Sequence, residues 1–105
     1  MQDYRDCGNR CVAVLEALSA TVFDPTKHWD AGEKPPPVDK TDLRIGAYIV
    51  GRTGGKGNEE LRGLEKKASA LAHKVKHSPS ADRVSAGIAA DAVILLADML
   101  RRLME

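Results

Sequence analysis

Apolar residues in the second half of the chain recur with the period of an α-helix, and this feature limits the fold more than any other. Between Asn58 and His77 they follow one another at alternating steps of three and four positions. That spacing is typical of a helix packed along one narrow seam. The residues of this seam are Leu61, Leu64, Ala68, Leu71 and Val75.

The segment after this helix is apolar around most of its circumference. Ser78-Pro79 resembles a helix N-cap followed by proline in the first turn, so a last helix is expected from about 79 to 104. A helix of such apolar breadth is either central in its bundle or also buried by a second chain. Its expected main face comprises Ala81, Val84, Ile88, Ala92, Leu95, Leu96, Met99 and Leu103, widened by Ala86, Ala89, Val93, Leu100 and Met104.

The first half of the chain predicts two further helices separated by a long connector. A helix over about 3–23 places one apolar face inward. The connector 24–41 is rich in proline, and its single tryptophan, Trp29, is expected to plug the edge of the core. The segment 42–51 is compatible with a helix or a strand, and we favour the helix. The face of the first helix comprises Tyr4, Cys7, Cys11, Val14, Leu15, Leu18 and Val22.

These elements predict an all-α fold, an antiparallel bundle of about four helices. The helices span about 3–23, 42–51, 58–77 and 79–104, and the last two form a hairpin across a short turn. A chain of 105 residues fits one domain with one modest core, so we expect a single domain over 1–105.

Composition restricts the classes of partner and the cellular compartment. The net charge of +1 argues against bulk electrostatic binding, so contact with nucleic acid requires a local patch. The chain has two cysteines, no signal-peptide pattern and no apolar run of about 18 residues. We therefore expect a reduced, cytoplasmic protein that does not insert into membranes.

Two sequence patterns suggest cofactor chemistry, and we reject both. Cys7-x3-Cys11 and His73-x3-His77 carry zinc-type ligands, but the cysteines lie on the apolar face of their helix and the histidines lie opposite the seam of theirs. The loop from Gly51 to Gly57 lacks the first glycine of a Walker A motif and the serine or threonine after its lysine. We predict no metal and no cofactor, two buried cysteines, and a flexible basic loop.

A basic stripe on the segment 58–77 is the remaining candidate for chemistry. Helical geometry places Arg62, Lys66, Ser69, His73 and His77 on the side away from the seam, with Lys76 at the edge. Imidazoles beside lysines can hold phosphates and move protons. The alternative is a solvated face that only keeps the protein soluble.

The chain resembles the HEPN domains of bacterial abortive-infection and other defence proteins. The resemblance covers most of the chain and is concentrated in its last two helices; it rests on the runs Tyr4–Leu18, Glu60–Leu64, Leu71–His77 and Ala89–Ala97. It implies a helical bundle that dimerises. In active members an arginine and a histidine from each protomer cut RNA in a shared cleft.

The HEPN signature is degenerate in this chain. His77 matches the motif histidine, His73 matches the polar residue after the arginine, and Ala72 occupies the arginine position. Alanine cannot stabilise charge on a phosphate, which is the arginine's role in the active members. We therefore expect a dimeric, non-catalytic module for RNA or a partner protein in bacterial defence or a toxin–antitoxin system.

Two other functions remain open. One is an active metal-independent ribonuclease that uses His77 and His73, and the other is a purely structural dimerisation module. For the binding functions the expected contacts to RNA or a partner are Arg62, Lys66, Lys74 and Lys76, and the expected dimer contacts are Ile94 and Leu100.

Overall fold

The described residues form four long helices and one single-turn helix. The structure is a computed structural model that describes residues 3–30, 32–55 and 58–105, all of them helical, turn or irregular. The expected all-α class is confirmed, and the segment for which a helix was favoured over a strand is a helix. The elements are α1 (Arg5–Val22), α2 (Pro25–His28), α3 (Thr41–Thr53), α4 (Asn58–His77) and α5 (Arg83–Leu103).

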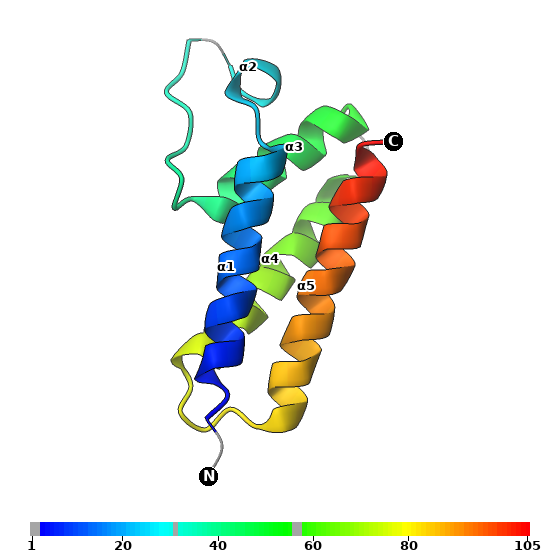
Figure 1. Cartoon of the computed structure of the whole chain (residues 1–105). Helices are drawn as coiled ribbons and strands as arrows, with labels where there is room; N and C mark the ends of the chain where they lie inside the picture. The colour runs from blue at the N-terminus through cyan, green and yellow to red at the C-terminus, as the bar shows by residue number, and fades with distance from the viewer. Residues whose placement is uncertain (1–2, 31, 56–57) are drawn as a thin grey trace.

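Three of the long helices lie side by side along the longest dimension of the molecule (Figure 1). α4 runs opposite to α1 and α5, and a short turn joins α4 to α5 in the expected hairpin. α3 crosses the end of this group that lies farther from the N-terminus, with α2 packed beside it. The molecule is therefore elongated, with extents of 50 × 25 × 19 Å.

The core fills the space where α1, α3, α4 and α5 meet. Its largest fully buried apolar side chains are Leu15, Ile45, Ile49, Leu96 and Leu100. Burial of each such side chain contributes about 1.5–3 kcal/mol, so these contacts dominate the stability of a domain this small.

A glycine decides how α1 faces α4. A Cβ atom on Gly8 would lie 2.2 Å from the backbone nitrogen of Lys76, so only glycine permits this approach of the two helices. As a result Gly8, Val12 and Ser19 are buried, while Val14 of the predicted apolar face is exposed. The inward face of α1 is therefore turned toward α4 relative to the prediction.

The connector and the end of α3 differ from those expected. The connector contains α2, because Pro25 stands at its first position and the Asp24 carboxylate accepts a hydrogen bond from the Thr26 amide. α3 continues through Gly51 to Thr53 and ends at Gly54, which adopts a left-handed φ of 66°. Residues 56 and 57 of the expected glycine loop lie outside the described residues.

α5 begins later than predicted, so the prediction that Ser78 caps it is wrong. The helix begins at Arg83, and the Asp82 side chain accepts a hydrogen bond of 2.8 Å from the Ser85 amide. Ser78 and Pro79 instead belong to the turn, where the Ser78 carbonyl accepts a hydrogen bond from the Ala81 amide. At the start of α3 the N-cap residue is Lys40, and no side chain caps the helix with a hydrogen bond.

The inward face of α5 is also different from the expected one. Its buried residues are mostly those predicted only to widen the face, whereas Val84, Ile88 and Leu95 of the predicted main face are more than half exposed. None of the helices in the described ranges combines the length and the apolarity required to span a bilayer. The buried residues of α5 are Ala86, Ala89, Val93, Leu96 and Leu100.

Trp29 is half-buried and packs against Phe23 outside the main core cluster, not at the core edge where it was expected. Its indole N–H donates a hydrogen bond of 3.0 Å to the Lys34 carbonyl, and its ring meets the buried ring of Phe23 edge-on. His28 packs edge-on against Tyr48, so the connector is held to α3 by aromatic contacts.

Candidate functional site

Ala72, where the HEPN resemblance leads us to expect an arginine, points into the core. Ala72 is 0% exposed, and it belongs to the cluster of side chains shared by the helices. The next residue, His73, is exposed because each helical step rotates the side-chain direction by about 100°. An arginine at position 72 would therefore enter the core rather than a solvent-accessible cleft.

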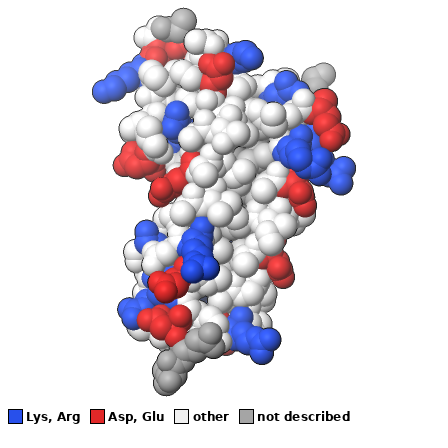
Figure 2. Space-filling view, viewed as in Figure 1, with Lys and Arg blue, Asp and Glu red and all other residues white. Residues whose placement is uncertain are grey.

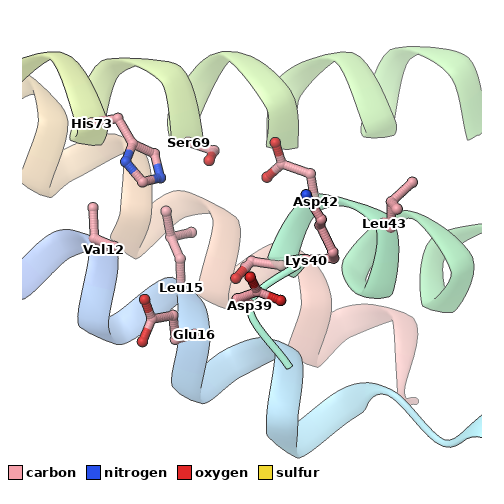
Figure 3. Close-up of a pocket in the computed structure, with 10 residues that line it drawn as sticks. Val12, Leu15, Glu16, Asp39, Lys40, Asp42, Leu43, Ser69 and His73 are labelled. Atoms are coloured by element: carbon pink, nitrogen blue, oxygen red, sulfur yellow. The ribbon is translucent and has the colours of Figure 1, made fainter. Parts of the chain in front are cut away.

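The two histidines of α4 lie together at its surface. Both are exposed, and their rings are nearly parallel with centroids 6.3 Å apart. Figure 3 shows His73 and Ser69 extending from α4 toward Glu16 of α1 and the residues before α3. The cavity between them measures about 170 Å³, which is below the range of about 300–1,000 Å³ typical of ligand pockets.

The chemistry available to His73 is limited. In the described part of the chain, no hydrogen bond or ion pair joins it to Ser69 or to Glu16. A general base needs such a link to a nucleophile or to an orienting group. Ser69 is itself buried, so the stripe that was expected to face away from the seam runs partly along the inner side of α4.

The four predicted binding cations lie in separate places. Arg62 and Lys66 border a cavity of about 530 Å³ beside α3, whereas Lys74 borders a cavity of about 160 Å³ beside the α4–α5 turn. Lys76 lies where the backbone of α4 meets Gly8. On the face drawn in Figure 2, basic and acidic side chains alternate at the rim, and an uncharged band runs between them. A continuous basic patch is absent from that face.

Both cysteines pack where α1 meets α5. The Cys7 thiol donates a hydrogen bond of 3.5 Å to the Ala86 carbonyl, and Cys11 is buried. Burial raises the pKa of the Cys11 thiol to about 11, with the neighbouring Cys7 adding to the shift. At neutral pH the Cys11 thiol is therefore protonated and unreactive.

The two predicted dimer residues have opposite environments. Ile94 is 61% exposed and lines a groove of about 640 Å³ between α1 and α5, with Val14 on the α1 side. Leu100, in contrast, is 1% exposed inside the monomer, and its carbonyl accepts a hydrogen bond of 3.1 Å from the Tyr48 hydroxyl. Leu100 is thus a core residue, which corrects its assignment to the interface.

A buried carboxyl group on α4 escaped the sequence-based prediction. Glu65 is 1% exposed, and burial together with a hydrogen bond to Asp42 of α3 raises its pKa to about 9. Oε1 of Glu65 and Nε of Arg62, one turn away, are both buried without a hydrogen-bond partner among the described residues. One sequence feature could have predicted the burial of Glu65. The residue stands four positions after Leu61 and directly after Leu64, at the edge of the apolar seam.

Comparison with protein-family models, with curated proteins and with solved structures finds no match for this chain.

Proposed function

We propose that this chain is a HEPN-like, non-catalytic helical module that forms a homodimer through α5 and the adjoining side of α1. The observation that supports this most directly is the set of large apolar side chains on the surface of α5. Large apolar side chains left exposed on one helix favour association in soluble proteins, and Ile94 among them lines the groove between α1 and α5. These exposed residues are Val84, Ile88, Ile94 and Leu95.

A second copy of the chain suits this surface because the surface carries both an exposed apolar side chain and a groove. Ile94 stands at the wall of the groove between α1 and α5, opposite Val14. In a two-fold dimer the same patch meets itself, so Ile94 of each copy would pack into the groove of the other. The uncharged band in Figure 2 crosses the face formed by these helices.

RNA is the less favoured partner. Sequence-independent binding to RNA depends on lysines and arginines that reach neighbouring phosphates. Here Arg62 and Lys66 lie apart from Lys74 and Lys76. A role in bacterial defence or in a toxin–antitoxin system follows only from the HEPN resemblance of α4 and α5, and a partner protein of such a system would compete for the same apolar face.

Sedimentation of an Ile94→Glu variant tests the dimer. A glutamate buried at the interface without a partner costs several kcal/mol, so we expect a dimer for the unchanged chain and a folded monomer for the variant at tens of micromolar. Ala70→Glu, on the exposed side of α4, is the matched control and should remain dimeric. A monomeric unchanged chain, or equal sedimentation of the chain and its Ile94→Glu variant, would contradict the proposal.

The second candidate is a ribonuclease that uses the two imidazoles. It is favoured by the exposure of His73 and His77 and by their near-parallel stacking on one turn of α4. Incubation of the chain with single-stranded RNA, in parallel with His77→Ala and His73→Ala, separates the two functions. Cleavage that disappears in His77→Ala would favour the enzyme, whereas intact RNA in all samples agrees with the non-catalytic module.

A further inference from the structure

The larger cavity beside α3 has the features of a ligand site. It measures about 530 Å³, within the range of small-molecule pockets, and residues from α2, α3 and α4 line it. Glu65 is among them, almost fully buried, with its Oε1 atom unpartnered. An unpartnered buried polar atom costs about 1–3 kcal/mol, so a group that approaches Glu65 from the cavity can recover that free energy.

The cavity carries a complementary group one helical turn from Glu65. Arg62 borders it, and the Nε–H of Arg62 is also buried, with no acceptor in the described part of the chain. Residues three apart on a helix have Cβ atoms about 5–6 Å apart, so this donor and the Glu65 acceptor belong to neighbouring positions of α4 without pairing with each other. A ligand that satisfies both atoms needs a donor next to an acceptor.

The charges around the cavity favour a ligand that carries both signs. Its ionised lining is balanced, since burial and Asp42 hold Glu65 in the neutral form. His28 adds no charge at neutral pH, because burial lowers its pKa and its Nδ1 accepts a hydrogen bond from the Asp24 amide. The three cations are Lys27, Arg62 and Lys66, and the three anions are Asp30, Glu33 and Asp42.

We infer that this cavity binds a small zwitterion of the α-amino-acid type. Its ammonium group lies against the carboxyls of Asp42 and Glu65. Its carboxylate lies against Arg62 and Lys66, and its side chain lies over Leu43, Ala47 and Val50, which form the apolar part of the lining. An ammonium group beside the two carboxyls favours ionisation of Glu65, so binding releases the proton that Glu65 holds.

The inferred site is independent of the proposed dimer. Its described lining residues come from α2, α3, α4 and the segment after α2, and none comes from α1 or α5. Metal is a poorer occupant, because no group of three or more potential metal ligands is arranged to hold an ion within the described residues. Failure of the dimer test therefore leaves this inference standing, and the reverse also holds.

Calorimetric titration of the full chain with each of the standard amino acids at neutral pH tests the inference. We expect saturable binding of at least one amino acid, with a heat that differs between two buffers of unlike ionisation enthalpy because a proton is released. Lys66→Gln should weaken binding several-fold. Lys67→Gln, next in sequence but absent from the lining, is the matched control and should bind as the unchanged chain does.

The Glu65→Gln variant provides a second test of the inferred site. Glutamine keeps the size of the side chain but cannot release a proton, so the buffer dependence should vanish and binding should weaken about tenfold or more. Circular dichroism establishes that the variant is folded, and Lys66→Gln at the exposed rim carries the test if it is not. Three results would overturn the inference: no binding of any amino acid at millimolar concentration, equal binding of spermidine, or equal weakening by Lys66→Gln and Lys67→Gln.

Discussion

Ala72 and His73 are neighbours in sequence but occupy opposite environments on α4. Ala72 is enclosed by the core, and His73 lies at the surface beside the cavity of about 170 Å³. If the proposed HEPN resemblance holds, the departure from its signature therefore involves more than a missing side chain. The helix is oriented so that the arginine position cannot reach solvent, which argues against a site that one substitution would restore.

An Ala72→Arg variant tests this orientation. We expect a loss of several kcal/mol in the free energy of unfolding, because a guanidinium would be buried without a partner and would overpack the core. Ala70→Arg, two residues earlier and exposed, should unfold at the same urea concentration as the unchanged chain. If Ala72→Arg were equally stable and gained RNA cleavage, the position would open into a cleft and the ribonuclease would become the favoured function.

The raised pKa of Glu65 predicts that the stability of the fold depends on pH. Its pKa is about 9 in the folded chain, against an ordinary value of 4.5 when exposed. Between these values the folded state holds a proton that the unfolded state has lost, so stability falls as pH rises, by at most about 1.4 kcal/mol per pH unit. Burial is the main cause of this raised pKa, Asp42 of α3 raises it further, and Lys66 of α4 lowers it.

Urea unfolding of the unchanged chain and of Glu65→Gln across this pH range measures the effect. Glutamine does not titrate, so the difference between the two unfolding free energies should change steadily from acid to alkaline pH in favour of the variant. Parallel curves would mean that Glu65 is ionised in the folded chain and holds no buried proton.

At the scale of elements, the contact between α1 and α4 depends on one missing side chain. Gly8 stands against the backbone of Lys76 and Val75, which cannot rotate away as a flexible side chain would. Gly8→Ala should therefore lower the free energy of unfolding by about 1–3 kcal/mol through overpacking. Gly63→Ala, in the interior of α4 with nothing near its Cβ position, should raise it by up to about 1 kcal/mol.

Thermal unfolding of these two glycine variants distinguishes helix propensity from packing. Both substitutions improve the intrinsic helix preference, so only a steric clash gives them opposite signs. Equal stabilisation of both variants would show that the two backbones stand farther apart than this structure places them.

α3 supports the end of α5 by hydrogen bonds. The Tyr48 hydroxyl donates to the Leu100 carbonyl, and Nε of Arg52 donates to the Leu103 carbonyl. The last four carbonyls of a helix have no partner within the helix, so these two bonds satisfy groups that would otherwise depend on water. The crossing of α3 over the end of the bundle therefore also fixes the position of the C-terminal end of α5.

At the scale of the whole molecule, two faces offer different chemistry. α5 and the adjoining side of α1 present apolar surface and a groove, whereas α2, α3 and α4 enclose the cavity with balanced charges. An elongated domain with a modest core leaves much of each helix near the surface, so one helix can serve the core on one side and a partner on another. The dimer and the ligand can thus be tested by substitutions that do not share residues.

The sequence by itself determined the all-α class, the bounds of α4 and the exposure of Ile94, because helical periodicity and breakers act within a few residues. It did not determine which side of a helix faces inward. On α5 the apolar residues surround most of the axis, so only packing against α1 and α4 decided that Leu100 is buried and Val84 exposed. Likewise Glu65 and Ser69 are buried because Gly8 lets α1 approach α4 and α3 crosses beside it, contacts between residues far apart in sequence that no local pattern records.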